Sequence, residues 1–129
     1  MIEDLNELKE CINELPGDMD REVHFVTTCA DIAINEKEIN RKKIYKLMES
    51  VAKDKVVTAD NIVNGFVPIF ASLGDIMIDS PLAGKWIGEL IGCCIKGGVD
   101  KGSVMERCVS NISNDRHKAK FQEGVDLVA

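Results

Sequence analysis

The chain has 129 residues, enough for one domain, and its 45 % hydrophobic and 29 % charged residues are typical of a globular protein. The formal net charge of −6 argues against a general nucleic-acid binder, which would present a basic patch, and suits a basic protein partner. No apolar run of about 18 residues occurs, and acids follow closely on Met1, so we expect neither a membrane span nor a signal peptide.

The first two predicted elements are amphipathic helices. Apolar residues over 2–15 recur at helical spacing with acids between them, and the pattern ends at Pro16-Gly17. Either Asp18 or Asp20 can cap a second helix, which we expect to run to about Ile34. The apolar stripe of the first helix consists of Leu5, Leu8, Ile12 and Leu15.

Two further helices follow in the middle of the chain. Asn35 and Glu38 form a capping-box-like start for a third helix. Thr58 is expected to cap a fourth helix that runs to Leu73. Pro68 lies inside this fourth helix, where it removes one backbone hydrogen bond, so we expect a kink there.

An alternating segment comes next, and it is the stretch in which we expect the function to lie. Strict alternation favours an extended backbone, with Asp75, Met77 and Asp79 on one side. Ile76 and Ile78 would then be buried on the other side. The sequence predicts a rigid acidic elbow between two helices, with its carboxylates facing outward.

The elbow is expected to lead directly into a fifth helix. Ser80 stands before Pro81, and Ser at the N-cap followed by Pro at the first helical position is typical of a helix start. We expect this helix to reach about Lys96. Glycine recurs in it at every fourth position, which indicates close packing against a neighbouring helix; these glycines are Gly84, Gly88 and Gly92.

Two last helices complete the predicted fold. One starts at Asp100 and extends to about Ile112, and the other starts at Asn114 or Asp115. The whole chain, residues 1–129, is therefore expected to be a single all-α domain of about seven helices. Short helices with tight connections fit stacked antiparallel hairpins, the architecture of HEAT-type solenoids.

Catalytic and cofactor chemistry finds little support in the sequence. In an extended elbow Asp75 and Asp79 would lie about 13 Å apart, more than the roughly 5 to 9.5 Å between glycosidase carboxyls. Residues 97–103 lack the ending of a phosphate-binding loop. We therefore expect neither an enzyme nor a cofactor.

Cysteine usage points to reduced core thiols rather than to disulfides or a metal site. The count is odd and no Cys-x-x-Cys occurs, and neither histidine stands at metal-ligand spacing from a cysteine. Such thiols are typical of the cytosol or nucleus. The cysteines are Cys11, Cys29, Cys93, Cys94 and Cys108, and the histidines are His24 and His117.

The elbow also resembles a known family. Asn64-Gly65-Phe66, followed by the run from Leu73 to Ala83, is similar to the signature of the MA-3 domain, and residues 4–15 resemble the opening hairpin helix of that family. On this resemblance the chain would be an atypical HEAT domain that lacks the family's first helix. Without that helix the apolar stripe of residues 2–15 would be partly exposed or covered by a second copy of the chain, so we expect weak self-association.

The resemblance implies a function as well. The family includes the scaffold translation initiation factor 4G and the translation inhibitor programmed cell death protein 4, and it binds the DEAD-box helicase initiation factor 4A. By this resemblance Asp75 and Asp79 would contact basic residues of the helicase's N-terminal lobe, with Met77, Ser80 and Pro81 completing the surface. The expected protein is a cytoplasmic helicase-binding scaffold module, without direct sequence-specific nucleic-acid binding. The alternatives are a helicase-sequestering inhibitor and a structural or oligomerisation domain without helicase contact.

Overall fold

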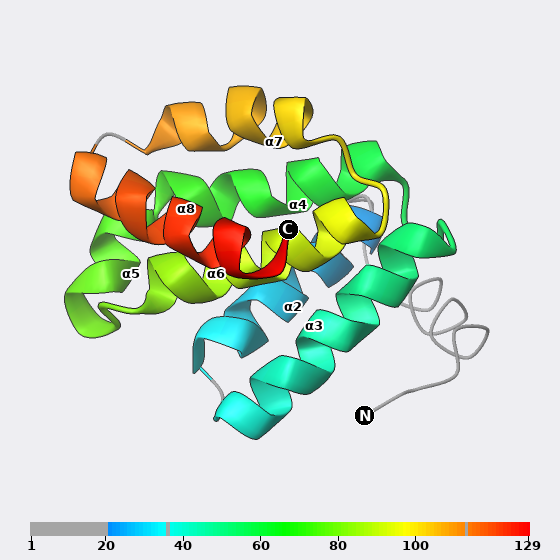
Figure 1. Ribbon diagram of the computed structural model, residues 1–129, viewed down its shortest axis with the longest axis horizontal. Helices are drawn as coiled ribbons and strands as arrows, with labels where there is room; N and C mark the ends of the chain where they lie inside the picture. The colour runs from blue at the N-terminus through cyan, green and yellow to red at the C-terminus, as the bar shows by residue number, and fades with distance from the viewer. Residues whose placement is uncertain (1–20, 36, 113) are drawn as a thin grey trace.

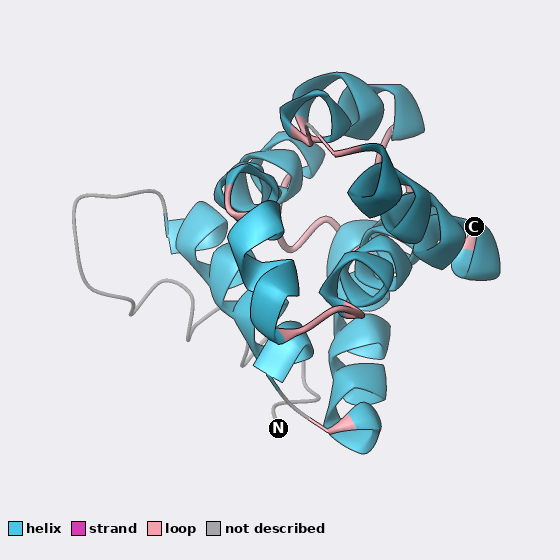
Figure 2. Ribbon diagram, turned by 90° about the vertical axis from the view of Figure 1, so that its left-hand side faces the viewer, coloured by secondary structure: helices cyan, strands magenta, loops and turns pink. Residues whose placement is uncertain are grey.

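The computed structural model describes residues 21–35, 37–112 and 114–129. These residues form seven α-helices and one short 3-10 helix, and no strand occurs among them (Figures 1 and 2). The predicted all-α, solenoid-like class is confirmed. The helices are α2 (Arg21–Asn35), α3 (Glu38–Lys53), α4 (Ala59–Ala71), α5 (Leu73–Asp79), α6 (Ala83–Lys96), α7 (Lys101–Arg107), η1 (Val109–Asn111) and α8 (Asp115–Val128). The helix predicted over 2–15 and its successor's cap at Asp18 or Asp20 lie outside the described residues.

Helix α6 is the centre of the domain. It packs most extensively against α8, then against α3 and α2, and one continuous apolar core joins all of these helices. Figure 1 shows α8 lying along α6, with α3 and α2 on its other side. Phe121 of α8 is fully buried and meets the Phe70 ring of α4 edge to face, with 5.1 Å between the ring centroids. Helix α8 therefore closes the core between α4 and α6.

The glycine spacing of α6 explains why α6 and α8 come so close. A Cβ added at Gly88 would lie 2.1 Å from the carbonyl oxygen of Phe121, and one added at Gly124 of α8 would lie 2.1 Å from that of Lys85. At Gly92 an added Cβ would lie 2.9 Å from Val128 Cβ. Bare glycines on both helices thus let the two backbones touch, and the close packing predicted from the spacing is confirmed.

Three predicted helix starts are confirmed by their capping bonds. Thr58 Oγ1 accepts from the N–H of Asn61 at 3.2 Å, and Asp100 Oδ2 accepts from the N–H of Ser103 at 3.0 Å. Asn114 Oδ1 accepts from the N–H groups of the second and third residues of α8, at 2.8 and 3.3 Å. Each side chain satisfies a backbone donor that the first helical turn leaves unpaired.

Several other predicted boundaries are wrong. The helix expected to extend from Asp100 to about Ile112 ends at Arg107, and a short 3-10 helix follows it. Asn35 does not start α3: it is the last residue of α2, and its amide donates back to the carbonyl oxygen of Asp31 at 2.8 Å. Helix α3 follows Lys37 without a side-chain cap. The fourth helix continues through Pro68 but ends at Ala71 rather than Leu73, and a 61° bend separates α4 from α5.

None of the described helices is by itself long and apolar enough to cross a membrane. Only α4 and α5 together reach the required length and composition, and the 61° bend lies between them. Most of the apolar residues of α4 are buried in the core, so packing inside the domain accounts for its composition.

Candidate functional site

The segment predicted as an extended elbow is in fact the short helix α5. Its first and last turns are closed by helical hydrogen bonds, from the N–H of Ile76 to the oxygen of Ser72 and from the N–H of Ser80 to the oxygen of Ile76, both 3.0 Å. No strand among the described residues offers its backbone to this segment, so an extended chain would leave its own N–H and C=O groups without partners. Helix formation satisfies them locally.

The helix keeps both acids on one outer face but brings them closer together. Asp75 and Asp79 are four residues apart, and a rise of about 1.5 Å per residue places them roughly 6 Å apart along the axis instead of about 13 Å. Both side chains are exposed, as predicted. Neither carboxylate makes a hydrogen bond or ion pair with a described residue. The pair is therefore available to an outside partner.

The two isoleucines, which the alternation predicted to be buried together, are separated by the helix. Ile76 is half-buried and packs against the core, whereas 78 % of Ile78 is exposed. Helical spacing places Ile78 on the same face as Asp75 and Asp79, so the outer face carries an exposed apolar side chain between two acids. Helical spacing applied to this segment would have predicted that Ile78 lies on the exposed face with the acids. An alternation of only five residues, however, does not distinguish an extended strand from a helix.

Met77 leaves the acidic face for the opposite side of α5. It is half-buried, and a Cβ added at Gly84 would lie 3.2 Å from its Sδ atom, so the thioether rests on α6. The prediction that Met77 shares the acids' side is wrong, because two residues along a helix turn the side chain through about 200° rather than 360°. With Pro81, Met77 lines a groove that faces α8.

Ser80 and Pro81 do not start the next helix as predicted. Helix α6 begins at Ala83 with Leu82 at its N-cap and without a side-chain cap. The backbone oxygen of Ser80 accepts from the N–H of Ala83 at 2.9 Å, so residues 80–83 form a turn. Pro81 is exposed in this turn, where it holds the connection between α5 and α6 in one direction.

The acids of α5 contribute little to the stability of the helix that carries them. Asp79 is its last residue, at the end of the helix dipole that disfavours negative charge, whereas Asp75 lies in the first turn, at the end that favours it. The two dipole effects, each about 0.3 to 1 kcal/mol, oppose one another, and the like charges one turn apart add a cost of a few tenths of a kcal/mol. Residues 1–20 hold seven acids and one lysine, so residues 21–129 carry no net formal charge. The pair is thus a local concentration of negative charge within a segment, residues 21–129, whose formal charges sum to zero.

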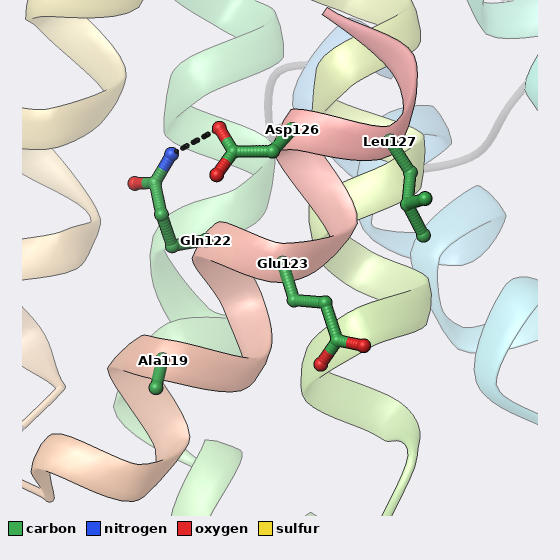
Figure 3. A pocket seen from close by; sticks show the side chains of 5 residues that line it. All are labelled: Ala119, Gln122, Glu123, Asp126 and Leu127. Atoms are coloured by element: carbon green, nitrogen blue, oxygen red, sulfur yellow. Dashed lines mark hydrogen bonds between the residues drawn. The ribbon is translucent and has the colours of Figure 1, made fainter.

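Other hollows among the described residues hold no comparable chemistry. Figure 3 shows one on the outer face of α8, where Gln122 Nε2 donates to Asp126 Oδ1 at 2.8 Å; every residue that lines it comes from α8 alone. No group of three or more His, Cys, Asp or Glu side chains in the described part of the chain could hold a metal ion. These surfaces offer neither a nucleophile nor a ligand cluster.

A second hollow lies between α3 and α6, and its polar side chains Arg41, Tyr45 and Glu89 already contact other groups of the fold. Arg41 is 8 % exposed; its Nε donates to the oxygen of Ala33 at 3.0 Å, and its guanidinium lies 3.7 Å from the centre of the Trp86 ring. The Tyr45 hydroxyl donates to Glu89 Oε2 at 2.7 Å. Burial, followed by this bond to Glu89, raises the pKa of Tyr45. The cluster braces α3 against α6.

The predicted core thiols are confirmed wherever the structure describes them. Cys29, Cys93, Cys94 and Cys108 are buried and unpaired, whereas Cys11 lies outside the described residues. Burial raises the pKa of Cys29 to about 12 and that of Cys93 and Cys108 to about 11, and it also raises the pKa of Cys94. Thiols held protonated in this way are inert side chains of the core rather than nucleophiles.

A comparison with known proteins bears on these features. The family model of the MA3 domain matches residues 1–99, which include α5 and α6 but not α7, η1 or α8. A von Willebrand factor A domain-containing protein of Dictyostelium discoideum is 22 % identical over 112 residues. That match covers 85 % of this chain but 5 % of the Dictyostelium protein, so the chain spans a small part of that relative. No solved structure matches the chain significantly.

Proposed function

The chain belongs to the MA3 domain family, whose members are protein-interaction modules, and we propose that it binds the DEAD-box helicase initiation factor 4A through the outer face of α5. In this proposal the domain holds the N-terminal lobe of the helicase and modulates its activity during translation initiation in the cytoplasm. The family resemblance supplies the partner, and the geometry of α5 supplies the contact surface. The domain itself performs no catalysis in this role.

One observation carries the proposal: Asp75 and Asp79 stand one helical turn apart on an open surface, with Ile78 exposed between them. Carboxylates without ion pairs can accept charge-assisted, often bidentate, hydrogen bonds from arginine. A neighbouring exposed isoleucine adds apolar area that becomes buried on association. The face therefore matches a partner that presents basic side chains around an apolar spot.

The attachment of α5 to the core keeps this face in place before binding. Leu73 is 1 % exposed, and Ile76 and Met77 pack partly against the core. The turn at Pro81 fixes the other end of the helix. A surface held in this way loses little conformational freedom on binding, so more of the contact energy appears as affinity.

Charge reversal on α5 tests the proposal. The variant Asp75→Lys with Asp79→Lys should lose about 2 to 5 kcal/mol of binding to the helicase, at least a thirtyfold rise in Kd, because basic groups of the partner would meet lysines. Calorimetric titration of the helicase with the chain measures this loss. Stability should change by less than about 1 kcal/mol, because both residues are exposed. Circular-dichroism melting checks that the fold persists.

A matched control separates the site from the general effect of charge. Asp31→Lys with Glu106→Lys makes the same change in net charge at exposed positions on α2 and α7, and it should leave helicase binding nearly unchanged. Likewise Ile78→Ala should weaken binding, whereas Ile39→Ala, at an isoleucine of α3 that is 67 % exposed, should not. Wild-type affinity in the α5 double variant, with a normal melt, would refute the proposed contact.

The direction of regulation follows from a helicase ATPase assay. Stimulation would favour a scaffold role like that of initiation factor 4G, and inhibition would favour sequestration like that of programmed cell death protein 4. Absence of any binding by the wild-type chain would leave a structural or oligomerisation role. The acidic pair is compatible with both signs of regulation, because it determines where the helicase is held rather than which step of its cycle changes.

A further inference from the structure

An open groove separates α5 from α8 on the side of α5 that faces away from the acids. Its volume is about 410 Å³, and it is lined by residues of α5, of α8 and of the turn after α5. Pockets of about 300 to 1,000 Å³ accommodate small ligands or a few peptide side chains. The lining residues are Met77, Pro81, Arg116, His117, Ala119 and Lys120.

The base of the groove is apolar and adaptable. Gly84 of α6 lies beneath it, and a Cβ added there would be 3.2 Å from Met77 Sδ and 3.4 Å from Lys120 Cβ. Glycine at this position leaves room for both the thioether and the lysine stem beside the α6 backbone. Methionine has three rotatable side-chain bonds and adjusts to differently shaped apolar groups. Pro81 and Ala119, both exposed, extend the apolar surface toward solvent.

The rim of the groove on α8 is basic. Arg116 is exposed, and its guanidinium makes no hydrogen bond or ion pair with a described residue. Lys120 pairs with Glu123 at 3.4 Å, an exposed contact of low strength, so it is available to a stronger partner. His117 lines the same groove and also the neighbouring hollow that contains Asp75. Two cations thus stand over an apolar floor.

We infer that this groove binds an acidic peptide segment of a partner protein. A leucine or phenylalanine of the segment lies between Met77 and Ala119, and adjacent carboxylates bind Arg116 and Lys120. Arginine favours carboxylates because its fork of N–H donors matches their geometry. The two sides of α5 then select opposite chemistries: basic groups at Asp75 and Asp79, and acidic groups at the groove.

Charge and shape favour a peptide over RNA. A single-strand binder would combine a continuous basic track with aromatic stacking side chains. Here residues 21–129 have no net charge, acids stand near the rim at Asp115 and Glu123, and no aromatic ring other than the His117 imidazole lines the groove. The inference does not depend on the helicase, because it concerns residues of α8 and the inner side of α5.

Methionine-methyl and histidine-ring NMR signals of the whole chain test the inference directly. The probe is a six-residue capped peptide, Glu-Asp-Leu-Phe-Asp-Glu, added up to about 2 mM, and the comparison peptide carries Lys in place of each acid. The acidic peptide should shift the signals of Met77 and His117 saturably, and it should leave that of the fully buried Met48 unmoved. The basic peptide should shift none of them.

Two variants and a matched control complete the test. Arg116→Glu with Lys120→Glu should raise the Kd of the acidic peptide at least tenfold, and Ala119→Trp should do the same by filling the groove at an exposed position. Lys43→Glu with Lys46→Glu makes the same charge change on α3, at exposed lysines, and should leave the Kd unchanged.

Three outcomes would overturn the inference: no shift of Met77 by the acidic peptide, equal shifts by both peptides, or shifts produced by a ribo-oligonucleotide but not by the acidic peptide. A wild-type chain that fails to bind the helicase but binds this peptide would refute the proposed function and leave the groove assignment standing. The reverse result would refute the groove alone.

Discussion

The α6–α8 crossing and helix α5 differ in how tightly they are packed, although α8 and α5 both contact α6. At the crossing the backbones touch, and a methyl group at Gly88 or Gly124 would overlap backbone atoms. On α5 a methyl group at Gly74 would meet only the His117 ring, at an ordinary 3.9 Å, and Leu73 is the one fully buried residue of this helix. The contrast indicates that stability resides at the crossing, and we propose that recognition resides on α5.

The α6–α8 crossing also involves residues that lie beyond the family match. The family match ends at residue 99, yet α8 makes the most extensive helix contact of the described fold and contributes Phe121 and Val125 to the core. Without α8 the glycine face of α6 would be exposed to water. We therefore propose that residues 100–129 belong to the same domain as the matched residues.

The largest expected effect is on the free energy of unfolding, which should depend strongly on α8 and only weakly on the exposed face of α5. Phe121→Ala should cost about 3 to 5 kcal/mol of unfolding free energy, because it removes a fully buried ring that contacts Phe70. Ile78→Ala on α5 should cost less than about 1 kcal/mol, because that side chain is mostly in water. Urea unfolding measures both values. Similar losses for the two variants would remove the distinction between the regions.

Alkaline pH should weaken the packed region through its thiols. Cys29 and Cys94 are held protonated in the folded state, whereas their ordinary pKa of 9.0 applies to the unfolded chain. Their stabilising effect is therefore complete below pH 9 and is lost as the pH rises toward about 12, the pKa of folded Cys29. From these two thiols we expect a loss of about 3 kcal/mol between about pH 9 and pH 10.5.

Urea unfolding at several pH values follows this loss, and Cys29→Ala provides the control. That variant should begin less stable, because it removes a buried sulfur, but its stability should decline less steeply above pH 9. A free energy of unfolding that stays constant up to about pH 10.5 would contradict the assignment of both thiols to the sealed core.

The smallest expected effect comes from replacing glycine by alanine. This substitution discriminates best between the two regions, because it should destabilise the chain at the α6–α8 crossing and stabilise it on α5. Alanine normally favours a helix over glycine by about 1 kcal/mol. At Gly88 the added methyl would force α6 and α8 apart, so Gly88→Ala should destabilise by about 1 to 3 kcal/mol. Thermal melting of the variant reports the change as a lower Tm.

Gly74→Ala is the matched control for this substitution. It introduces the same methyl group into a helix where there is space, so it should stabilise the chain by about 0.5 to 1 kcal/mol and raise the Tm. Helicase binding should persist, because Asp75, Ile78 and Asp79 remain on their face. Destabilisation at Gly74 comparable with that at Gly88 would mean that α5 is packed as tightly as the crossing.

Much of this fold was determined by short-range chemistry that the sequence alone displays. Thr58, Asp100 and Asn114 start helices because each side-chain oxygen lies within three residues of an unpaired N–H and bonds to it, and this local contact does not depend on where the helix lies in the fold. The glycine spacing of α6 likewise predicted a close contact with another helix, because only residues without a Cβ atom allow two helix backbones to touch. The outward direction of Asp75 and Asp79 was predictable too, because carboxylates without partners remain in water.

Tertiary structure decided what the local pattern left open. The alternation over residues 75–79 suits a strand or one and a half turns of helix, and only the absence of a neighbouring strand among the described residues selects the helix. That selection exposes Ile78 and turns Met77 inward. The partner helix of the glycines, and the groove that Arg116 and Lys120 form with Met77, depend on how α8 returns across α6. Residues some forty positions apart in sequence meet there, and no local spacing encodes their contact.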